Sequence, residues 1–258
     1  MPALYAHNRF GSDLLPSLPA DVRKTVNRFP QLFRVGLQGP DIFFYYSPGF
    51  KTTVGSLGDA AHNQSGIEFF RQAAKAANTE AGFAYLYGLL AHYAMDSLCH
   101  PYIHGQKHEN GLIHMQLESE FERYLLALDG VSVPETFHRG KPIRLTRGEC
   151  VTVAPFFPPA TPAQINWTVH ASRWSQWWFS LPHGIFRRLM LRVLKALGKN
   201  HMYLVVPSRA EPKFRATNAR MMELYAQSLD RYRVLLEQLT AHMKTGAPLG
   251  PEFEPDFG

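Results

Sequence analysis

The sequence predicts an all-α fold, with residues 1–258 forming a single domain of many helices. Over most of the chain, apolar residues recur at the spacing of one helix face. Prolines with β-branched residues between them interrupt this pattern in one stretch, 131–160, which we expect to connect a first half, 1–130, to a second half, 161–245. With 258 residues and a 45% hydrophobic composition, the chain is long enough to bury one large core. It has no run of eighteen apolar residues, so no membrane-spanning helix is predicted.

The first half begins with short elements. A helical pattern covers about 19–29, and the segment GLQGPDIFFYYSPG that follows is predicted to be a loop, because Gly39 and Pro40 break a helix. A helix over about 65–77 is predicted from apolar residues at helical spacing, namely Ile67, Phe70, Ala74 and Ala77.

Two longer helices complete the first half. The segment TEAGFAYLYGLLAHYAMDSLCHP, which starts at Thr79, is apolar almost all round, so we expect a central buried helix that stops at Pro101. A second helix is predicted over 112–128 from one apolar stripe, formed by Ile113, Leu117, Phe121, Tyr124 and Leu128.

The second half is predicted to be helical again. The connection over 131–160 has room for a short hairpin between its prolines, after which helices are expected over about 161–179, 183–198 and 211–243. The tail after Gly246 contains prolines and acidic residues, and we expect it to fray.

Composition gives weaker indications of location and partners. The formal net charge is +6, which favours anionic partners. Cys99 and Cys150 do not resemble a disulfide framework, and free thiols are expected. The N-terminal sequence MPALYAHNRFGSDLL lacks the pattern of a signal peptide, so a cytoplasmic protein is expected. Histidine is the unusual residue, with 12 in the chain and seven of them within the first 114 residues: His7, His62, His92, His100, His104, His108 and His114.

The clearest local pattern is His92-x-x-x-Asp96-x-x-x-His100. Residues four apart share one face of a helix, so three potential ligands point the same way from an otherwise apolar segment. A buried aspartate needs a partner, and a metal ion is one solution. The next helix repeats the spacing with His114-x-x-x-Glu118.

A single histidine on an apolar face is more often a hydrogen-bonded core residue than a ligand. Two such pairs on consecutive helices favour a metal, and histidine with carboxylate suits zinc. Two divalent ions close together are a known arrangement for phosphoester hydrolysis. We expect His104 and His108, in the polar stretch IHGQKHENG, to be exposed, although His104 competes with His100 for a ligand role.

Five motifs occur in order, namely AHNRFG around His7, GPDIFFYY around Asp41, AHNQSGIEFF around His62, GLLAHYAMDSLCHPYIH and HMQLESEFERYLL. Together they resemble the zinc-dependent phospholipase C family over about residues 5–128. The single-strand-specific zinc nucleases are a related branch. The resemblance implies an all-helical fold around a cleft with two to three zinc ions.

The resemblance also implies roles for individual residues. One zinc would be held by Asp41, His62, His92 and Asp96. Asp96 would bridge to a second zinc, which His7 also binds. The third would be held by His100, His114 and Glu118. In the family the ligand corresponding to His100 lies beyond the proline, as His104 does here, but the facing of the helix favours His100.

The implied reaction is hydrolysis of a phosphodiester, with a metal-bound hydroxide attacking the phosphorus of a phospholipid or similar phosphoester. Asp41 would serve as the catalytic base. Tyr45 and Tyr46 are candidates for substrate binding through cation–π contact with a choline group, with core packing as the alternative. Phe43 and Phe44 are expected in the core.

Other function classes stay open at this point. The same site would serve a nuclease or nucleotidase, and a helical protein with a non-catalytic metal site is a further alternative. A His-Asp phosphohydrolase would need adjacent His-Asp residues, which the chain lacks.

The segment IFRRLMLRVLKALGK, residues 185–199, predicts a basic amphipathic helix. Its apolar residues Phe186, Leu189, Met190, Val193 and Leu197 fall on one side, and Arg188, Arg192, Lys195 and Lys199 on the other. With the upstream aromatic residues Trp174, Trp177, Trp178 and Phe179, this pattern suits an anionic membrane surface. The alternatives are an ordinary helix that packs its apolar stripe inward, and a nucleic-acid face, for which no specific motif is present.

Overall fold

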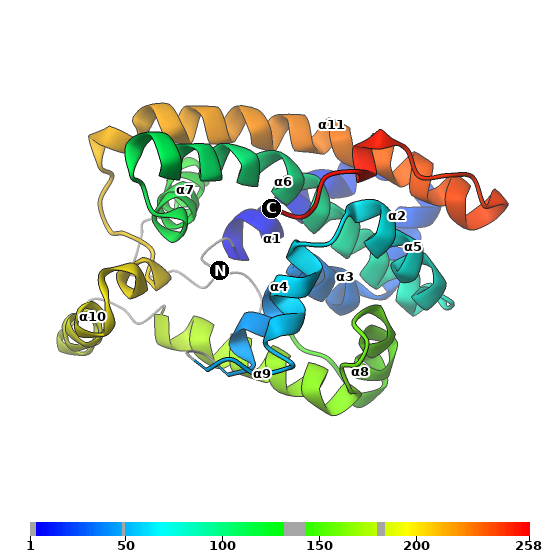
Figure 1. Ribbon diagram of the computed structural model, residues 1–258, viewed down its shortest axis with the longest axis horizontal. Coiled ribbons are helices and arrows are strands. Elements are labelled where there is room, and N and C mark those ends of the chain that lie inside the picture. Colours follow the sequence, from blue (N-terminus) through cyan, green and yellow to red (C-terminus); the bar gives the residue numbers. More distant parts are fainter. Residues whose placement is uncertain (1–3, 48–49, 132–142, 180–183) are drawn as a thin grey trace.

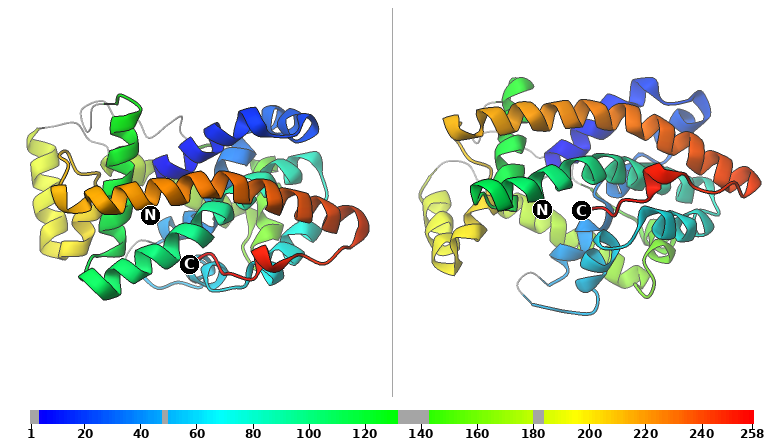
Figure 2. Two further views of the ribbon diagram at one scale, coloured as in Figure 1. Left: turned by 90° about the horizontal axis from the view of Figure 1, so that it is seen from above. Right: turned by 45° about the horizontal axis from the view of Figure 1, so that its top comes forward.

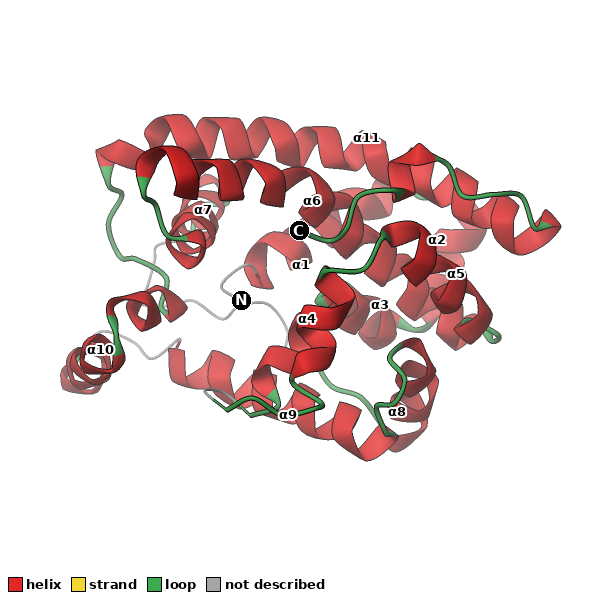
Figure 3. Cartoon of the chain, viewed as in Figure 1, coloured by secondary structure: helices red, strands yellow, loops and turns green. Residues whose placement is uncertain are grey.

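The structure is a computed structural model that describes residues 4–47, 50–131, 143–179 and 184–258. Every regular element within these ranges is an α-helix or a short 3₁₀ helix (Figure 3). The all-α prediction is therefore confirmed. Within the described residues, no helix is both long enough and apolar enough to cross a membrane.

The long helix α6 (Glu80–Asn110) forms the centre of the molecule. It packs against α3 (Pro30–Gly36), α11 (Arg215–Thr245) and α2 (Ala20–Arg28). Helix α11 lies along α6 in Figure 1 and crosses it at an angle when seen from above in Figure 2. Its middle is buried on all sides, as the apolar sequence predicted.

The prediction that this helix ends at Pro101 is wrong. A proline removes one backbone hydrogen bond, but it does not end a helix whose next turn is held by packing. Here Ile103, just beyond the proline, is buried in the core and carries the helix onward.

Two glycines allow α3 and α6 to approach closely. A Cβ atom on Gly88 of α6 would lie 2.1 Å from the carbonyl oxygen of Phe33, and one on Gly36 of α3 would lie 2.3 Å from that of Tyr85. The close packing of these two backbones therefore depends on the absence of side chains at both positions.

The other elements of the first half surround α6. They are α1 (Leu4–Leu14), η1 (Leu15–Ser17), η2 (Gly39–Tyr45), α4 (Ser56–His62), α5 (Gly66–Ala76) and α7 (His114–Leu128). The predicted helices over 19–29, 65–77 and 112–128 correspond to α2, α5 and α7. Within the segment GLQGPDIFFYYSPG, which was expected to be a loop, Gly39–Tyr45 form the 3₁₀ helix η2. Pro40 fits near the start of such a helix.

The second half contains α8 (Arg147–Val153), η3 (Ala154–Phe156), α9 (Pro162–Phe179), α10 (Ile185–Leu197), η4 (Lys199–Leu204), η5 (Pro212–Phe214) and α11. In the connection, residues 132–142 lie outside the described residues. The described remainder forms α8 rather than a hairpin, because Thr146 and Glu149 build a reciprocal capping box at its start.

The expectation that the tail after Gly246 frays is wrong. Gly246 ends α11 with a φ of 73°, a backbone conformation that suits glycine. The chain then turns back, forms η6 (Pro251–Phe253) and buries Leu249, Phe253 and Phe257 (Figure 1). These three apolar side chains anchor the tail to the body.

One hydrophobic cluster extends from Ala6 of α1 to Phe257 of the tail. The residues of this cluster come from helices on both sides of the proline-containing connection. Cys99 and Cys150 are both buried and not bridged, as expected.

Candidate metal centre

Five elements bring the predicted ligand residues together. His7 comes from α1, Asp41 from η2 and His62 from the end of α4, while α6 supplies His92, Asp96 and His100. His114 and Glu118 lie four residues apart at the start of α7. Apart from Asp41 and His114, which are partly exposed, these residues are buried.

Asp96 lies at the centre of the cluster. Its Oδ1 is 3.3 Å from Nε2 of His7, and its Oδ2 is 3.0 Å from Nε2 of His92 and 3.9 Å from Nε2 of His100. The rings of His7 and His92 stack with their centroids 4.4 Å apart. One buried carboxylate therefore faces three imidazoles from two helices.

Asp41 and His62 form one edge of the cluster, with Asp41 Oδ1 3.2 Å from His62 Nε2. The backbone of η2 comes close to α6 here because residue 39 is a glycine. It has a φ of 52°, and a Cβ atom at this position would lie 2.4 Å from the His92 ring. Gly39 thus permits Asp41 to reach the histidines of α6.

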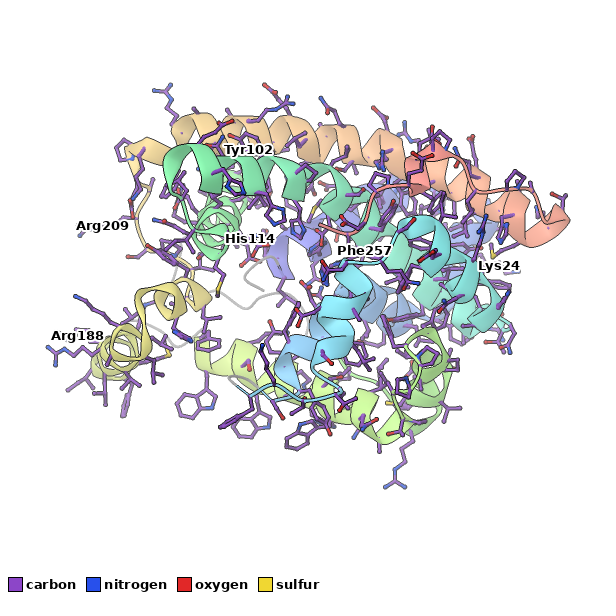
Figure 4. The ribbon with its side chains drawn as sticks, viewed as in Figure 1. Lys24, Tyr102, His114, Arg188, Arg209 and Phe257 are labelled. Atoms are coloured by element: carbon purple, nitrogen blue, oxygen red, sulfur yellow. The ribbon has the colours of Figure 1, made fainter. Side chains whose placement is uncertain are left out.

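His100, His114 and Glu118 form the opposite edge. Glu118 Oε1 lies 2.8 Å from Nε2 of His114 and 3.6 Å from Nε2 of His100. Figure 4 shows His114, the first residue of α7, near the middle of the molecule. The two ends of the cluster are linked through α6, which carries both Asp96 and His100.

Main-chain oxygens fix the orientation of three of the imidazoles. Nδ1 of His62 lies 2.8 Å from the Gly58 carbonyl, Nδ1 of His92 lies 3.3 Å from that of Leu37, and Nδ1 of His100 lies 3.2 Å from the main-chain oxygen of Gly258. A carbonyl accepts only, so each Nδ1–H donates, and Nε2 is the nitrogen that faces the cluster and can bind a metal when the ring is neutral. Metal-ligating histidines are held in this way.

The carboxylates are ionised. Burial works to raise the pKa of Asp96, but the neighbouring His92, His100 and His7 outweigh it and hold that pKa below the ordinary range. Burial is likewise overcome at Asp41, where positive neighbours that include His62 and His92 lower the pKa, and at Glu118, where those neighbours include His114 and His100. Two buried anions, Asp96 and Glu118, and the partly exposed anion Asp41 therefore lie close together.

The surroundings shift the pKa values of the histidines in opposite directions. Burial lowers the pKa of His7 to about 4 even though Asp96 opposes it. At His100, burial is overcome by Asp96 and Glu118, which raise its pKa to about 9. At His62, burial is overcome mainly by Asp41, and its pKa is raised as well. The proton on His100 thus offsets part of the negative charge when no cation is bound, and the pKa of His62 is shifted in the same direction.

The residues present fit divalent metal ions. Nδ1 of His7 is buried and lacks a hydrogen-bond partner among the described residues. Nε2 of His92 lies 3.0 Å from Asp96 Oδ2 but makes no hydrogen bond there, because the proton of this ring is on Nδ1 and donates to Leu37. Such buried nitrogens are costly unless another partner is supplied. Within the described chain, ligand atoms lie within 4.8 Å of one another in three groups: His7, Asp41 and His92; His62, His92 and Asp96; and His100, His114 and Glu118. Imidazole and carboxylate groups in such sets are the ligands that zinc takes.

A sequence model described as zinc dependent phospholipase C matches residues 6–154, which is more than half of the chain and includes every residue of the cluster. The chain belongs to the zinc-dependent phospholipase C family. Among curated proteins and among solved structures, no match to the chain was found.

The family assignment implies zinc, the geometry provides groups of ligand atoms that could hold metal ions, and the number of ions stays a prediction. The set predicted for the third zinc, His100, His114 and Glu118, coincides with one of the three groups. The ligands predicted for the first and second zinc are the same five side chains that form the other two groups, divided differently. His104 belongs to none of these groups and is exposed, as is His108.

A cavity of about 250 Å³ adjoins the cluster. It is lined by Asp41, His62, His100, His114 and Glu118 of the cluster and by Phe44, Asp59, Asn63, Met115 and Gly258. A phosphoester in this cavity would contact the exposed edge of the metal centre.

Of the four aromatic residues after Asp41, only Phe44 differs from its prediction. Phe43 is buried in the core, as expected, but Phe44 lines the cavity, with its ring centroid 5.6 Å from that of His62. Tyr45 is buried, and Tyr46 packs against the core while its carbonyl accepts a hydrogen bond from Trp167. Neither tyrosine is among the described residues that line the cavity, so their role in substrate binding stays a prediction.

Sequence reasoning missed the contribution of the tail. The buried Phe257 ring lies 6.0 Å from that of His62 and 5.9 Å from that of His92, and Gly258 accepts from His100 (Figure 4). The spacing of Phe253 and Phe257, four residues apart, was the available signal for burial. Asp59 and Asn63 were also missed, although they stand three residues before and one residue after His62 on the wall of the cavity.

Proposed function

We propose that this protein is a zinc-dependent hydrolase that cleaves the phosphodiester of a phospholipid, releasing a phosphomonoester and an alcohol. The observation that supports this most is the largely buried cluster of five histidines and three carboxylates beside a cavity large enough for a phosphate group. Membership of the zinc-dependent phospholipase C family supports the same class of reaction.

The cluster would hold two to three zinc ions. When bound, zinc would lower the pKa of a water to about 7 and offset the charge on the phosphate. The chain's own residues supply the rest of the chemistry. The backbone partners of His62, His92 and His100 hold these rings so that little reorganisation is needed when metal and substrate bind.

Asp41 is the residue best placed to accept a proton from the attacking water. It is ionised, it lines the cavity, and its other contact is His62, which keeps the carboxylate in place. A general base must reach the reacting proton directly or through one water, and Asp41 meets this requirement for a substrate in the cavity.

The cavity suits a cationic headgroup such as phosphocholine. Asp59 supplies a carboxylate and Phe44 an aromatic ring on the same wall. A quaternary ammonium is stabilised by both, through charge attraction and cation–π contact.

The test combines zinc loading with two substrates. We expect the zinc-loaded protein to hydrolyse a water-soluble chromogenic phosphocholine ester and to leave single-stranded DNA intact. Asp41→Asn should abolish most of the hydrolysis, whereas Asp21→Asn, at an exposed aspartate of α2, serves as the matched control. Cleavage of the DNA in preference to the ester would instead support the nuclease alternative. No hydrolysis by a zinc-loaded protein would support a non-catalytic metal site.

A further inference from the structure

Helix α10 turns its apolar side outward. Among its described side chains only Arg187 and Leu194 are buried. Five large apolar side chains are between 51% and 75% exposed, namely Ile185, Phe186, Leu189, Val193 and Leu197. The alternative in which this stripe packs on the domain is therefore contradicted.

The orientation of α10 is fixed by its opposite side. Arg187 donates a hydrogen bond to the carbonyl of Val206, 3.1 Å away, and Leu194 is buried on the same side of the helix. The helix also contacts η4. Because these contacts use the inner side, the outer apolar stripe is left without a covering element among the described residues.

Basic residues lie next to this stripe. Arg188, Arg192 and Lys195 are exposed and fall together on one side of α10, beside the apolar arc, and Arg188 projects outward in Figure 4. The surrounding sequence is strongly biased, since residues 150–210 contain seven Lys or Arg and no Asp or Glu. The formal charge of this segment, +7, is larger than the net charge of the whole chain, which is +6.

The neighbouring helix α9 adds aromatic residues. Trp167, Trp174 and Trp178 are 50% to 62% exposed, and their spacing of seven and four places them on one face of the helix. Figure 1 shows α9 along the lower edge of the molecule, with α10 at the lower left. Indole rings, aliphatic side chains and basic groups are thus presented by two consecutive helices.

We propose that the exposed surface of α9 and α10 docks on an anionic lipid membrane. This α9–α10 surface consists of Trp167, Trp174 and Trp178 on α9 and of Ile185, Phe186, Arg188, Leu189, Arg192, Val193, Lys195 and Leu197 on α10. An interfacial helix has an exposed apolar face bordered by lysine and arginine, and tryptophan prefers the boundary between headgroups and acyl chains. Anionic lipids attract the basic groups, which explains the absence of acids across the segment. Binding to nucleic acid would use the charge but leave the aliphatic row in water.

The surface is also connected to the candidate metal centre. Helix α9 packs on η2, the element that carries Asp41, and Trp167 donates a hydrogen bond to the Tyr46 carbonyl at the end of that element. Docking would therefore involve a helix that directly contacts the element carrying Asp41. The docking itself does not depend on the proposed hydrolysis, and the experiment keeps the two apart.

The experiment is cosedimentation with vesicles in the presence of EDTA, so that no hydrolysis takes place. We expect binding to vesicles of phosphatidylcholine with phosphatidylserine, weaker binding to phosphatidylcholine alone, and loss of binding at high salt. The charge reversal Arg188→Glu, Arg192→Glu, Lys195→Glu should weaken binding by roughly 100-fold or more. The matched control Lys24→Glu, Arg71→Glu, Lys75→Glu changes the net charge equally at exposed positions elsewhere and should bind nearly as the unsubstituted chain does.

The apolar row has its own test. Phe186→Ser with Leu189→Ser should reduce binding even at low salt, whereas Val234→Ser, at an exposed position of α11, should not. The unsubstituted chain offers a readout that needs no variant, because all four tryptophans lie on α9. Their fluorescence should shift to the blue with vesicles and be quenched by lipids brominated on the acyl chains.

Several results would overturn the proposal. Equal loss of binding in both charge-reversal variants would show that only net charge matters, and unchanged tryptophan fluorescence would show that α9 does not enter the lipid. A dimer that forms through this surface in solution and does not bind vesicles would identify a second copy as the occupant. Tighter binding to single-stranded DNA than to anionic vesicles would identify nucleic acid. Cleavage of the soluble phosphocholine ester is measured separately and decides only the proposed function.

Discussion

The raised pKa of His100 predicts that zinc binding releases a proton. Asp96 and Glu118 together raise that pKa to about 9, so at pH 7.5 the imidazole of the metal-free protein is almost fully protonated. Zinc binds only the neutral ring, and its arrival therefore displaces nearly one proton from this residue. His62, whose pKa is also raised, adds to the release.

Calorimetric titration of the metal-free protein with zinc measures this release. At pH 7.5 the apparent enthalpy should differ between two buffers of different ionisation enthalpy, and the difference gives the number of protons. His100→Gln should lower that number by about one. His108→Gln, an exposed histidine on the same helix outside the three groups, should leave it unchanged. Equal proton release by the unsubstituted chain and His100→Gln would refute the reasoning.

The same shift has a consequence for stability without metal. The pKa of His100 is higher in the folded protein than its ordinary value of 6.5. Its contribution to the free energy of unfolding is therefore complete below pH 6.5 and is lost as the pH rises to about 9. The loss over this range is roughly 3 kcal/mol at most. Urea denaturation of the metal-free protein at pH 6.5 and pH 9 measures it, and equal stability at the two values would contradict the assigned contacts.

Three further predictions concern packing and catalysis. Gly88→Ala should destabilise the fold by about 1–3 kcal/mol in urea denaturation, because its Cβ meets the Phe33 carbonyl, whereas Gly148→Ala on α8, with open space around it, should be neutral or stabilising. Phe257→Ala should cost about 3–5 kcal/mol and weaken zinc binding, while Phe50→Ala, at a position that is 80% exposed, should change neither; a stable Phe257→Ala would show that the tail is not anchored. Asp41→Asn should lower kcat for the phosphocholine ester by about 100-fold or more with little change in KM, and an unchanged kcat would exclude Asp41 as the base.

Local rules account for much of the fold. The helical spacing within 65–77, 112–128 and 161–179 is a property of neighbouring residues, and the corresponding helices are present. The i, i+4 relation among His92, Asp96 and His100 follows from the same geometry, and these three side chains do meet. Where a prediction depended on packing at a distance, it was less reliable. Pro101 marks the end of a helix by local rules, but the burial of Ile103 carries α6 past it.

The parts of the site that sequence could not provide come from contacts between distant segments. Nδ1 of His92 donates to Leu37, 55 residues away, and Nδ1 of His100 donates to Gly258, 158 residues away. No local pattern specifies such partners. The tail was expected to fray because it contains prolines and acidic residues, yet Phe253 and Phe257 are buried and Phe257 lies against the histidines. Likewise, the exposure of the apolar stripe on α10 depends on what the rest of the chain does not cover.

The most direct test of the metal centre is the zinc content of the purified protein, measured by elemental analysis. We predict two to three zinc ions per chain. Three ions are expected if each group of ligand atoms binds one, and two if the two groups that share His92 bind a single ion between them. Glu118→Gln should lower the content by about one ion, because this residue belongs to a single group, whereas Glu223→Gln, at an exposed position of α11, should not. Fewer than two zinc ions in the unsubstituted chain would contradict the proposed hydrolytic centre.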